Sequence, residues 1–140
     1  MKTALFPGSF DPFTSGHEAI VRRALALFDK VYVAVGNNTD KHYMFAIPER
    51  IQRIQACFPD EPRVEAVAYS GMTIDLCHSL GTQFIIRGIR NAHDLAYEQT
   101  VAAVNHSLDP AIDTVILLSD FEHQDISSTL ERERLAHQNH

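Results

Sequence analysis

The sequence predicts an α/β fold, a doubly wound five-stranded parallel sheet with helices on both faces. Short apolar segments rich in β-branched residues alternate with longer helical patterns along the chain, and this alternation is typical of parallel sheets buried on both sides. The length of 140 residues suits a single domain over residues 1–140. Its 45% hydrophobic and 21% charged residues are ordinary for a globular protein.

The strands are predicted from short runs of apolar residues. Most of these runs are continuous rather than alternating, as expected for strands covered on both faces. They are Ala4–Phe6, Val31–Val35, Val64–Ala68, Phe84–Ile86 and Thr114–Leu118.

Helices are predicted between the strands, over Gly16–Phe28, Pro48–Phe58, Met72–Leu80 and Ala92–Leu108, with a last helix that begins at Ser127 or Ser128. Pro48 suits the first turn of a helix, where its missing N–H costs nothing. Gly81 suits a C-cap, and Pro110 marks the end of the longest helix.

The formal net charge of −6 argues against a general nucleic-acid binder. The chain shows no signal-peptide pattern, and no run approaches the about 18 apolar residues of a membrane span, so we expect a cytoplasmic protein. Cys57 and Cys77 are isolated, which favours buried thiols over a disulfide. The histidine spacings predict no transition-metal site.

The segment Pro7–His17 carries the strongest functional signal. It follows a strand and precedes a helix, whose first turn offers unpaired N–H groups and a positive dipole end to an anion. Its glycines allow close backbone approach, and Ser9, Thr14 and His17 add hydroxyl and imidazole groups. We interpret it as a phosphate-binding loop. The alternative is an Asp-Pro turn with a capping threonine and an incidental histidine.

Thr14–His17 resembles the T-x-G-H signature of the nucleotidyltransferase superfamily, and the string Pro-Gly-Ser-Phe-Asp-Pro-Phe-Thr is similar to its phosphopantetheine adenylyltransferase branch. The resemblance implies a Rossmann-like nucleotidyltransferase fold. Ligands in such sheets bind at the carboxyl ends of the strands, where the strand order reverses. The candidate residues follow five strands, so we expect them to meet at one edge.

The segment Arg87-Gly88-Ile89-Arg90 resembles the R-G-[ILV]-R element of the same family, and Tyr97-Glu98 matches its Y-E pair. Guanidinium groups bind phosphate with two parallel hydrogen bonds, which suits a polyphosphate site. The alternatives are two solvated arginines and a solvated carboxylate on a helix. By resemblance, Glu98 lies near the ribose and base of the nucleotide.

Two further segments agree with the family. Lys41, followed by Met44 and Phe45, matches its lysine loop, although His42-Tyr43 differs from the usual residues there. The segment Ile126–Arg132 resembles the I-S-S-T-x-x-R signature. Its hydroxyls and free N–H groups suit the phosphates of a nucleotide, and on the plainer interpretation they cap a helix.

The resemblance spans Ala4 to Arg132 and implies an enzyme of coenzyme A biosynthesis. Such enzymes transfer AMP from ATP to 4′-phosphopantetheine and release dephospho-CoA and pyrophosphate. It implies catalytic roles for His17, Lys41 and Arg90, by in-line positioning and stabilisation of charge in the transition state. The implied ATP-binding residues are Ser9, Phe10, His17, Gly88, Ile89, Arg90, Glu98, His123, Ile126, Ser127, Ser128 and Thr129. Ser9, Lys41, Thr73 and Arg87 are the implied residues for phosphopantetheine. Mg²⁺ bound with ATP and a homo-oligomer, commonly a hexamer, are also implied, with no nucleic-acid or membrane partner.

Other assignments stay open at this point. Nicotinamide mononucleotide adenylyltransferases share both superfamily signatures, and glycerol-3-phosphate cytidylyltransferases share the first. A nucleotide-binding domain without catalytic activity is a third alternative, although His17, Lys41 and Arg90 are all present. Family members usually continue past the last motif with another helix, whereas this chain ends at His140, which leaves the assembly state and full activity open.

Overall fold

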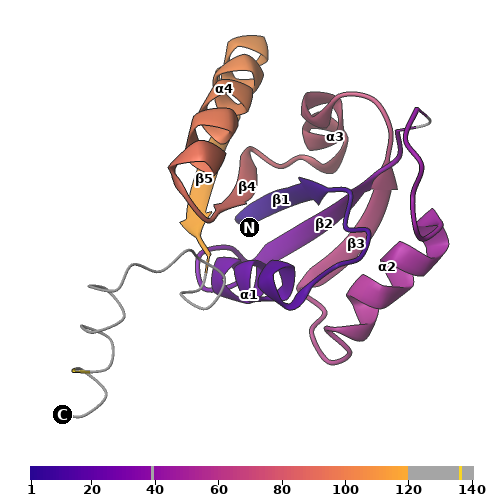
Figure 1. Cartoon of the computed structure of the whole chain (residues 1–140). Coiled ribbons are helices and arrows are strands. Elements are labelled where there is room, and N and C mark those ends of the chain that lie inside the picture. Colours follow the sequence, from indigo (N-terminus) through magenta and orange to yellow (C-terminus); the bar gives the residue numbers. More distant parts are fainter. Residues whose placement is uncertain (39, 120–135, 137–140) are drawn as a thin grey trace.

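The computed structural model describes residues 1–38, 40–119 and 136 and contains one five-stranded sheet (Figure 1). The strands are β1 Thr3–Gly8, β2 Lys30–Gly36, β3 Val64–Tyr69, β4 Phe84–Ile89 and β5 Asp113–Leu118. Every neighbouring pair is parallel, and the order across the sheet is β3-β2-β1-β4-β5. The predicted fold class is confirmed.

Helices cover both faces of the sheet, so the sheet is doubly wound (Figure 1). On one face α1 Ser15–Ala24 and α2 Ile47–Ala56 bury Ile20, Val21 and Ile54 against strand residues such as Phe6 and Val33. On the other face lie α3 Thr73–Leu80 and α4 Ala92–Leu108, and side chains of α3 pack against the strand side chains that point to this face. The strands alternate between the two clusters, as the two-residue period of a strand requires.

Several boundaries match the prediction. Helix α4 has the predicted bounds, and Pro48 lies in the first turn of α2. Gly81 caps α3 in the left-handed conformation, with φ of 69°. Cys77 is buried, and that burial, with a smaller contribution from Asp109, raises the pKa of its thiol to about 11.

Other boundaries differ. Helix α1 ends at Ala24 rather than Phe28, because the chain turns at Leu25 and sends Leu27 into solvent while Phe28 returns to the core. Strand β4 continues to Ile89 rather than stopping at Ile86, because its pairing with β5 runs on to Leu118. Arg87 and Gly88 are therefore strand residues rather than loop residues. The predicted last helix lies outside the described residues.

The strand order positions the site. From β1 the chain proceeds outward to β2 and β3, then crosses to β4 on the other side of β1. The order thus reverses between β1 and β4, and the carboxyl ends of these two strands diverge there. Among the described helices, none combines the length and apolar character needed to cross a membrane.

Candidate active site

A cleft of about 800 Å³ opens at the carboxyl ends of β1 and β4, where the strand order reverses. It is lined by seven of the predicted site residues, which come from the loop after β1, from the start of α1, from the end of β4 with the residue that follows it, and from α4. They are Ser9, Phe10, His17, Arg87, Gly88, Arg90 and Glu98. These segments therefore meet at one edge of the sheet, as predicted for them, whereas the predicted residues 123–129 after β5 lie outside the described residues.

Two smaller cavities adjoin this cleft. One, of about 170 Å³, contains Thr73 and shares Arg87 and Glu98 with the cleft. The other, of about 510 Å³, contains Lys41 and shares Ser9 with it. Gly8, the last residue of β1, lines all three spaces. Lys41 and Thr73 thus line separate cavities, which share Gly8 and Tyr69.

The start of α1 fixes the imidazole of His17. Thr14 is the N-cap, and its hydroxyl accepts a hydrogen bond from the His17 N–H at 3.3 Å. In return, the Thr14 N–H donates to His17 Nδ1 at 3.0 Å, which completes a capping box. Because Nδ1 accepts, the proton of the neutral ring is on Nε2. Burial of His17, and secondly the positive charge of Arg87, lower its pKa from the ordinary value of 6.5.

Aromatic side chains surround that imidazole. The ring centroids of Phe10 and Phe13 lie 5.0 and 5.4 Å from that of His17. Phe10 has a φ of 49°, which is unusual for a residue other than glycine, and its ring lies directly against Gly8. A Cβ on Gly8 would come within 2.8 Å of Phe10 Cζ, so a side chain at that position would force the Phe10 ring to shift.

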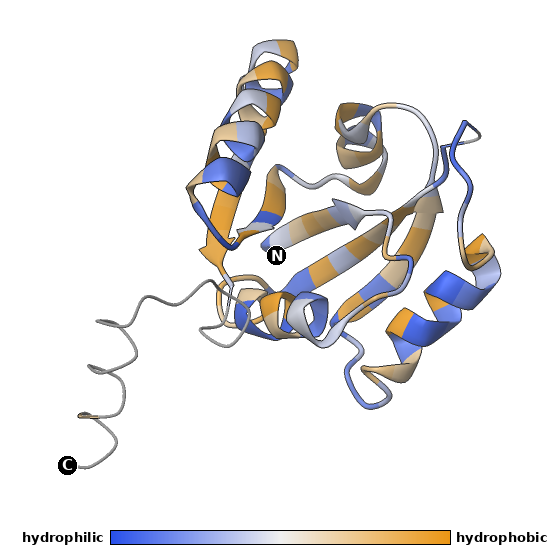
Figure 2. Cartoon of the chain, viewed as in Figure 1, coloured by the Kyte–Doolittle hydropathy of each residue, from blue (hydrophilic) through white to orange (hydrophobic). Residues whose placement is uncertain are grey.

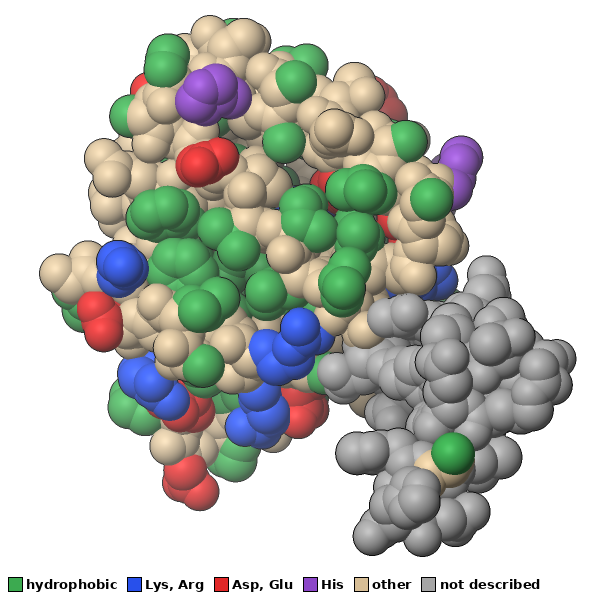
Figure 3. Space-filling model, turned by 90° about the vertical axis from the view of Figure 1, so that its left-hand side faces the viewer, with side chains coloured by type: hydrophobic (Ala, Val, Ile, Leu, Met, Phe, Trp, Pro, Cys, Tyr) green, Lys and Arg blue, Asp and Glu red, His purple; other side chains and the backbone are tan. Residues whose placement is uncertain are grey.

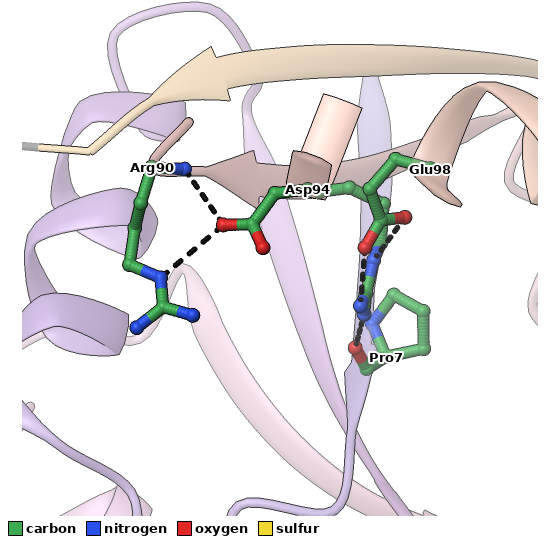
Figure 4. A network of polar contacts seen from close by, with 5 residues as sticks. Pro7, Arg90, Asp94 and Glu98 are labelled. Atoms are coloured by element: carbon green, nitrogen blue, oxygen red, sulfur yellow. Dashed lines mark hydrogen bonds and ion pairs between the residues drawn. The ribbon is translucent and has the colours of Figure 1, made fainter. Parts of the chain in front are cut away.

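Arg87 and Glu98 form a two-pronged ion pair at the boundary of the cleft (Figure 4). Nε and Nη2 of Arg87 donate to the two carboxylate oxygens of Glu98 at 2.9 and 2.8 Å, and Nη1 donates to the Pro7 carbonyl. The Glu98 side chain is only 6% exposed. The Glu98 carboxylate therefore orients Arg87. The sequence did not indicate this pairing, since the family resemblance implied only that Glu98 lies near the ribose.

Arg90 is held in a similar way by Asp94 (Figure 4). One carboxylate oxygen of Asp94 accepts both the Arg90 backbone N–H at 3.0 Å and its Nε at 3.2 Å. The backbone N–H bond, followed by the side-chain bond, lowers the pKa of Asp94. Sequence analysis did not single out Asp94, although its spacing of four residues from Arg90 was a usable signal.

One described site residue, Ile89, is absent from the lining of these cavities. It is buried beneath the site. His123, Ile126, Ser127, Ser128 and Thr129 lie outside the described residues. Within residues 1–38 and 40–119, no group of three or more His, Cys, Asp or Glu side chains could hold a metal ion.

Known proteins resemble this chain over nearly its whole length. The cytidylyltransferase-like family model matches residues 5–134. A phosphopantetheine adenylyltransferase of Flavobacterium psychrophilum is 44% identical over 95% of this chain and 87% of its own length. A protein of the same name from Lacticaseibacillus paracasei is 47% identical over 94% of this chain and 80% of its own.

Solved structures support the fold. A bifunctional NMN adenylyltransferase/ADP ribose pyrophosphatase from Francisella tularensis aligns with a TM-score of 0.66 at 16% identity, over 98% of this chain and 42% of that protein. A lipopolysaccharide core biosynthesis protein from Thermoplasma volcanium aligns with a TM-score of 0.59 at 19% identity, over 86% of this chain and 97% of that protein. At such identities the likeness concerns the fold alone.

Proposed function

This chain belongs to the phosphopantetheine adenylyltransferase family of cytidylyltransferase-like proteins, and from this premise we propose that it transfers AMP from ATP to 4′-phosphopantetheine. A phosphate oxygen of phosphopantetheine forms a bond to the α-phosphorus of ATP. The bond from that phosphorus to the bridging oxygen breaks, and pyrophosphate leaves with the electron pair. The other product is dephospho-CoA.

The observation that carries the proposal is the position of His17. It lies at the N-terminus of α1, in the cleft where the strand order reverses, and Arg87 and Arg90 line the same cleft. A helix N-terminus and two guanidinium groups around one imidazole suit a polyphosphate whose charge grows during the reaction.

His17 acts as a hydrogen-bond donor in this mechanism. The acceptor phosphate carries charge at neutral pH and needs no general base. The capping box leaves the Nε2–H available, and we assign it to an α-phosphate oxygen as negative charge develops there. A donor fixed in advance costs no reorganisation when the reaction occurs.

The two adjoining cavities suit the phosphopantetheine substrate. Lys41 and Arg87 hold its phosphate together with Ser9, since each of the three lines a space that opens on Gly8. The narrower cavity with Thr73 accepts the pantetheine arm. Its lining includes Val101, Ala102 and Asn105 of α4, a mixture of apolar and amide groups that suits a chain of amides and methylenes.

ATP occupies the main cleft in this proposal. Arg90 binds its phosphates, and Gly88 lines the same cleft. Gly88 itself packs tightly, since a Cβ there would lie 3.2 Å from the Ile20 side chain. His123 and the segment Ile126–Thr129 complete the ATP site by resemblance, together with Phe10, Ile89 and Glu98.

Mg²⁺ enters as part of the MgATP substrate. The cleft carboxylates already have partners, because Asp94 is bonded to Arg90 and Glu98 to Arg87. The protein residues therefore suit an ion held chiefly by phosphate oxygens and water, as is usual for Mg²⁺.

Assembly into a homo-oligomer, a hexamer by family resemblance, is part of the proposal. Hydrophobic side chains gather on the side of the molecule where α4 and β5 lie (Figures 1 and 3). The half-exposed residues there include Tyr97, Val104, Leu108 and Leu118, and β5 is hydrophobic along most of its length (Figure 2). Only Glu98 of α4 is fully buried, so this helix has apolar surface to give to another copy.

A cytoplasmic location belongs to the same proposal, since ATP is the substrate. The experiment that tests the reaction is product analysis. Incubation with MgATP and 4′-phosphopantetheine should yield dephospho-CoA by mass spectrometry, in equal amount to pyrophosphate. Pyrophosphate without dephospho-CoA would contradict the assigned acceptor.

A further inference from the structure

A carboxylate that the mechanism does not use joins two loops of the site. Asp11 lies in the loop after β1, and its Oδ2 and Oδ1 accept the backbone N–H groups of Met44 and Phe45 at 2.6 and 2.8 Å. The segment 41–45 follows β2 and begins with Lys41. Both oxygens of one side chain thus fasten the lysine segment to the loop that leads to His17.

A buried arginine fastens the same segment from the other side. Arg50 of α2 is 1% exposed. Its Nε donates to the Phe45 carbonyl at 3.0 Å, and its Nη1 donates to the carbonyls of Ser9 and Gly36 at 2.8 and 3.2 Å. Its guanidinium carbon also lies 4.0 Å from the ring centroid of Tyr43. Burying a charge is unfavourable unless hydrogen bonds compensate. The buried guanidinium therefore favours the conformation in which all three carbonyls accept its hydrogen bonds, and this holds the carbonyls in place.

These contacts surround the cavity of Lys41. Ser9, Gly36 and Tyr43 line that cavity, and all three contact Arg50. Phe45 is held at its N–H by Asp11 and at its carbonyl by Arg50. The lysine itself is exposed and its stem is flexible, so the path of the backbone decides where its ammonium group can reach.

We propose that Asp11 and Arg50 are positioning residues, which hold the 41–45 segment against the loop after β1 and so place Lys41 for the acceptor phosphate. This inference rests on the proposed function, in which Lys41 binds that phosphate. Neither residue belongs to the implied ATP or phosphopantetheine set. Asp11 does line the main cleft, but both of its carboxylate oxygens are bonded to the 41–45 segment, so the effect of both residues on catalysis passes through Lys41.

The test is a double-mutant cycle. Asp11→Asn keeps the shape but replaces one acceptor oxygen by a donor, so one of the two N–H groups loses its partner. We expect kcat/KM for phosphopantetheine to fall about 10- to 100-fold, the scale of a small misplacement of a substrate-binding group, with ATP affinity within about twofold. In a Lys41→Ala background the same change should cost less than about twofold, because the residue through which it acts is gone.

Arg50→Lys should show the same coupling, because a lysine keeps the charge but cannot reach three carbonyls in the fixed fork of a guanidinium. Asp60→Asn and Arg63→Lys are matched controls. Both residues lie in the connection before β3, at the opposite edge of the sheet, and Arg63 also donates to a backbone carbonyl, that of Leu25. Equal losses in the parent and Lys41→Ala backgrounds would show a merely structural role and overturn the proposal.

A second measurement does not depend on activity. Asp11→Asn should speed amide hydrogen exchange in a peptide covering residues 41–45, while exchange in β1 stays unchanged. Unchanged exchange in the 41–45 peptide would overturn the positioning role of Asp11 and Arg50. This measurement decides the question even if Arg50→Lys does not fold. If the parent uses nicotinamide mononucleotide instead of phosphopantetheine, the proposed function fails, and the cycle with that acceptor still decides the role of the clamp.

Discussion

The carboxylate of Glu98 accepts both Nε and Nη2 of Arg87, at 2.9 and 2.8 Å, across the gap between α4 and β4. The pair lies where the main cleft meets the cavity of Thr73. The third nitrogen of the same guanidinium, Nη1, donates to the Pro7 carbonyl. The orientation of Arg87, which we propose to bind phosphate, is thus set by a residue eleven positions along the chain.

Glu98→Gln should destabilise the protein, because it leaves the half-buried Arg87 guanidinium with a neutral partner that offers only one acceptor. We expect the free energy of unfolding to fall by about 1–3 kcal/mol, the range for a hydrogen-bonded charged group. Urea unfolding measures this change. The control is Glu65→Gln, whose ion pair with Lys30 is half exposed on the glutamate side and should cost less than about 1 kcal/mol. Equal losses in the two variants would contradict a special role for the Arg87–Glu98 pair.

His17→Ala should lower kcat with little effect on ATP binding, since its donor acts mainly in the transition state. The expected loss is about 2–4 kcal/mol of transition-state stabilisation, the scale of one oxyanion donor. Steady-state kinetics and ATP titration measure the two quantities. His78→Ala is the control, because His78 is exposed at the far end of α3 and pairs with Asp109. Turnover within about threefold of the parent would refute the assigned role.

The lowered pKa of His17 makes a pH-dependent contribution to stability. Because the folded pKa lies below the ordinary 6.5, the unfolded chain takes up the proton first as the pH falls. The contribution of His17 to the free energy of unfolding is complete above pH 6.5 and is lost as the pH falls from there through the lower folded pKa. Urea unfolding from about pH 8 to about pH 5 should show a steeper loss in the parent than in His17→Gln. Parallel profiles would contradict the burial of a neutral imidazole.

The apolar surface of α4 and β5 should support assembly. Val104→Lys places a charge in this surface, where Val104 is 54% exposed in the single chain, and should lower the molecular mass in solution. Light scattering coupled to size exclusion measures it, with Gln52→Lys on α2 as the control on the other face of the sheet. An unchanged mass in Val104→Lys would exclude this surface as the interface.

The sequence predicted the strands, the order of motifs and the edge where they meet, because apolar periodicity and turn residues are local signals. The predicted β4 was too short, because an arginine and a glycine give no local signal that Arg87 and Gly88 pair with β5. Asp11 and Arg50 escaped notice for a related reason. Asp11 belongs to an Asp-Pro turn pattern and Arg50 to a polar helical pattern, and most of their partners are backbone groups far away in the sequence. Contacts of this kind depend on the fold rather than on a motif.

Pyrophosphate release from MgATP, measured with 4′-phosphopantetheine, with nicotinamide mononucleotide and without an acceptor, tests the central claim most directly. We expect release with phosphopantetheine alone, and a large loss of that release in His17→Ala. Release with the mononucleotide alone would keep the nucleotidyltransferase fold and contradict the substrate. Tight ATP binding without release under any condition would contradict the enzyme itself and favour a nucleotide-binding domain.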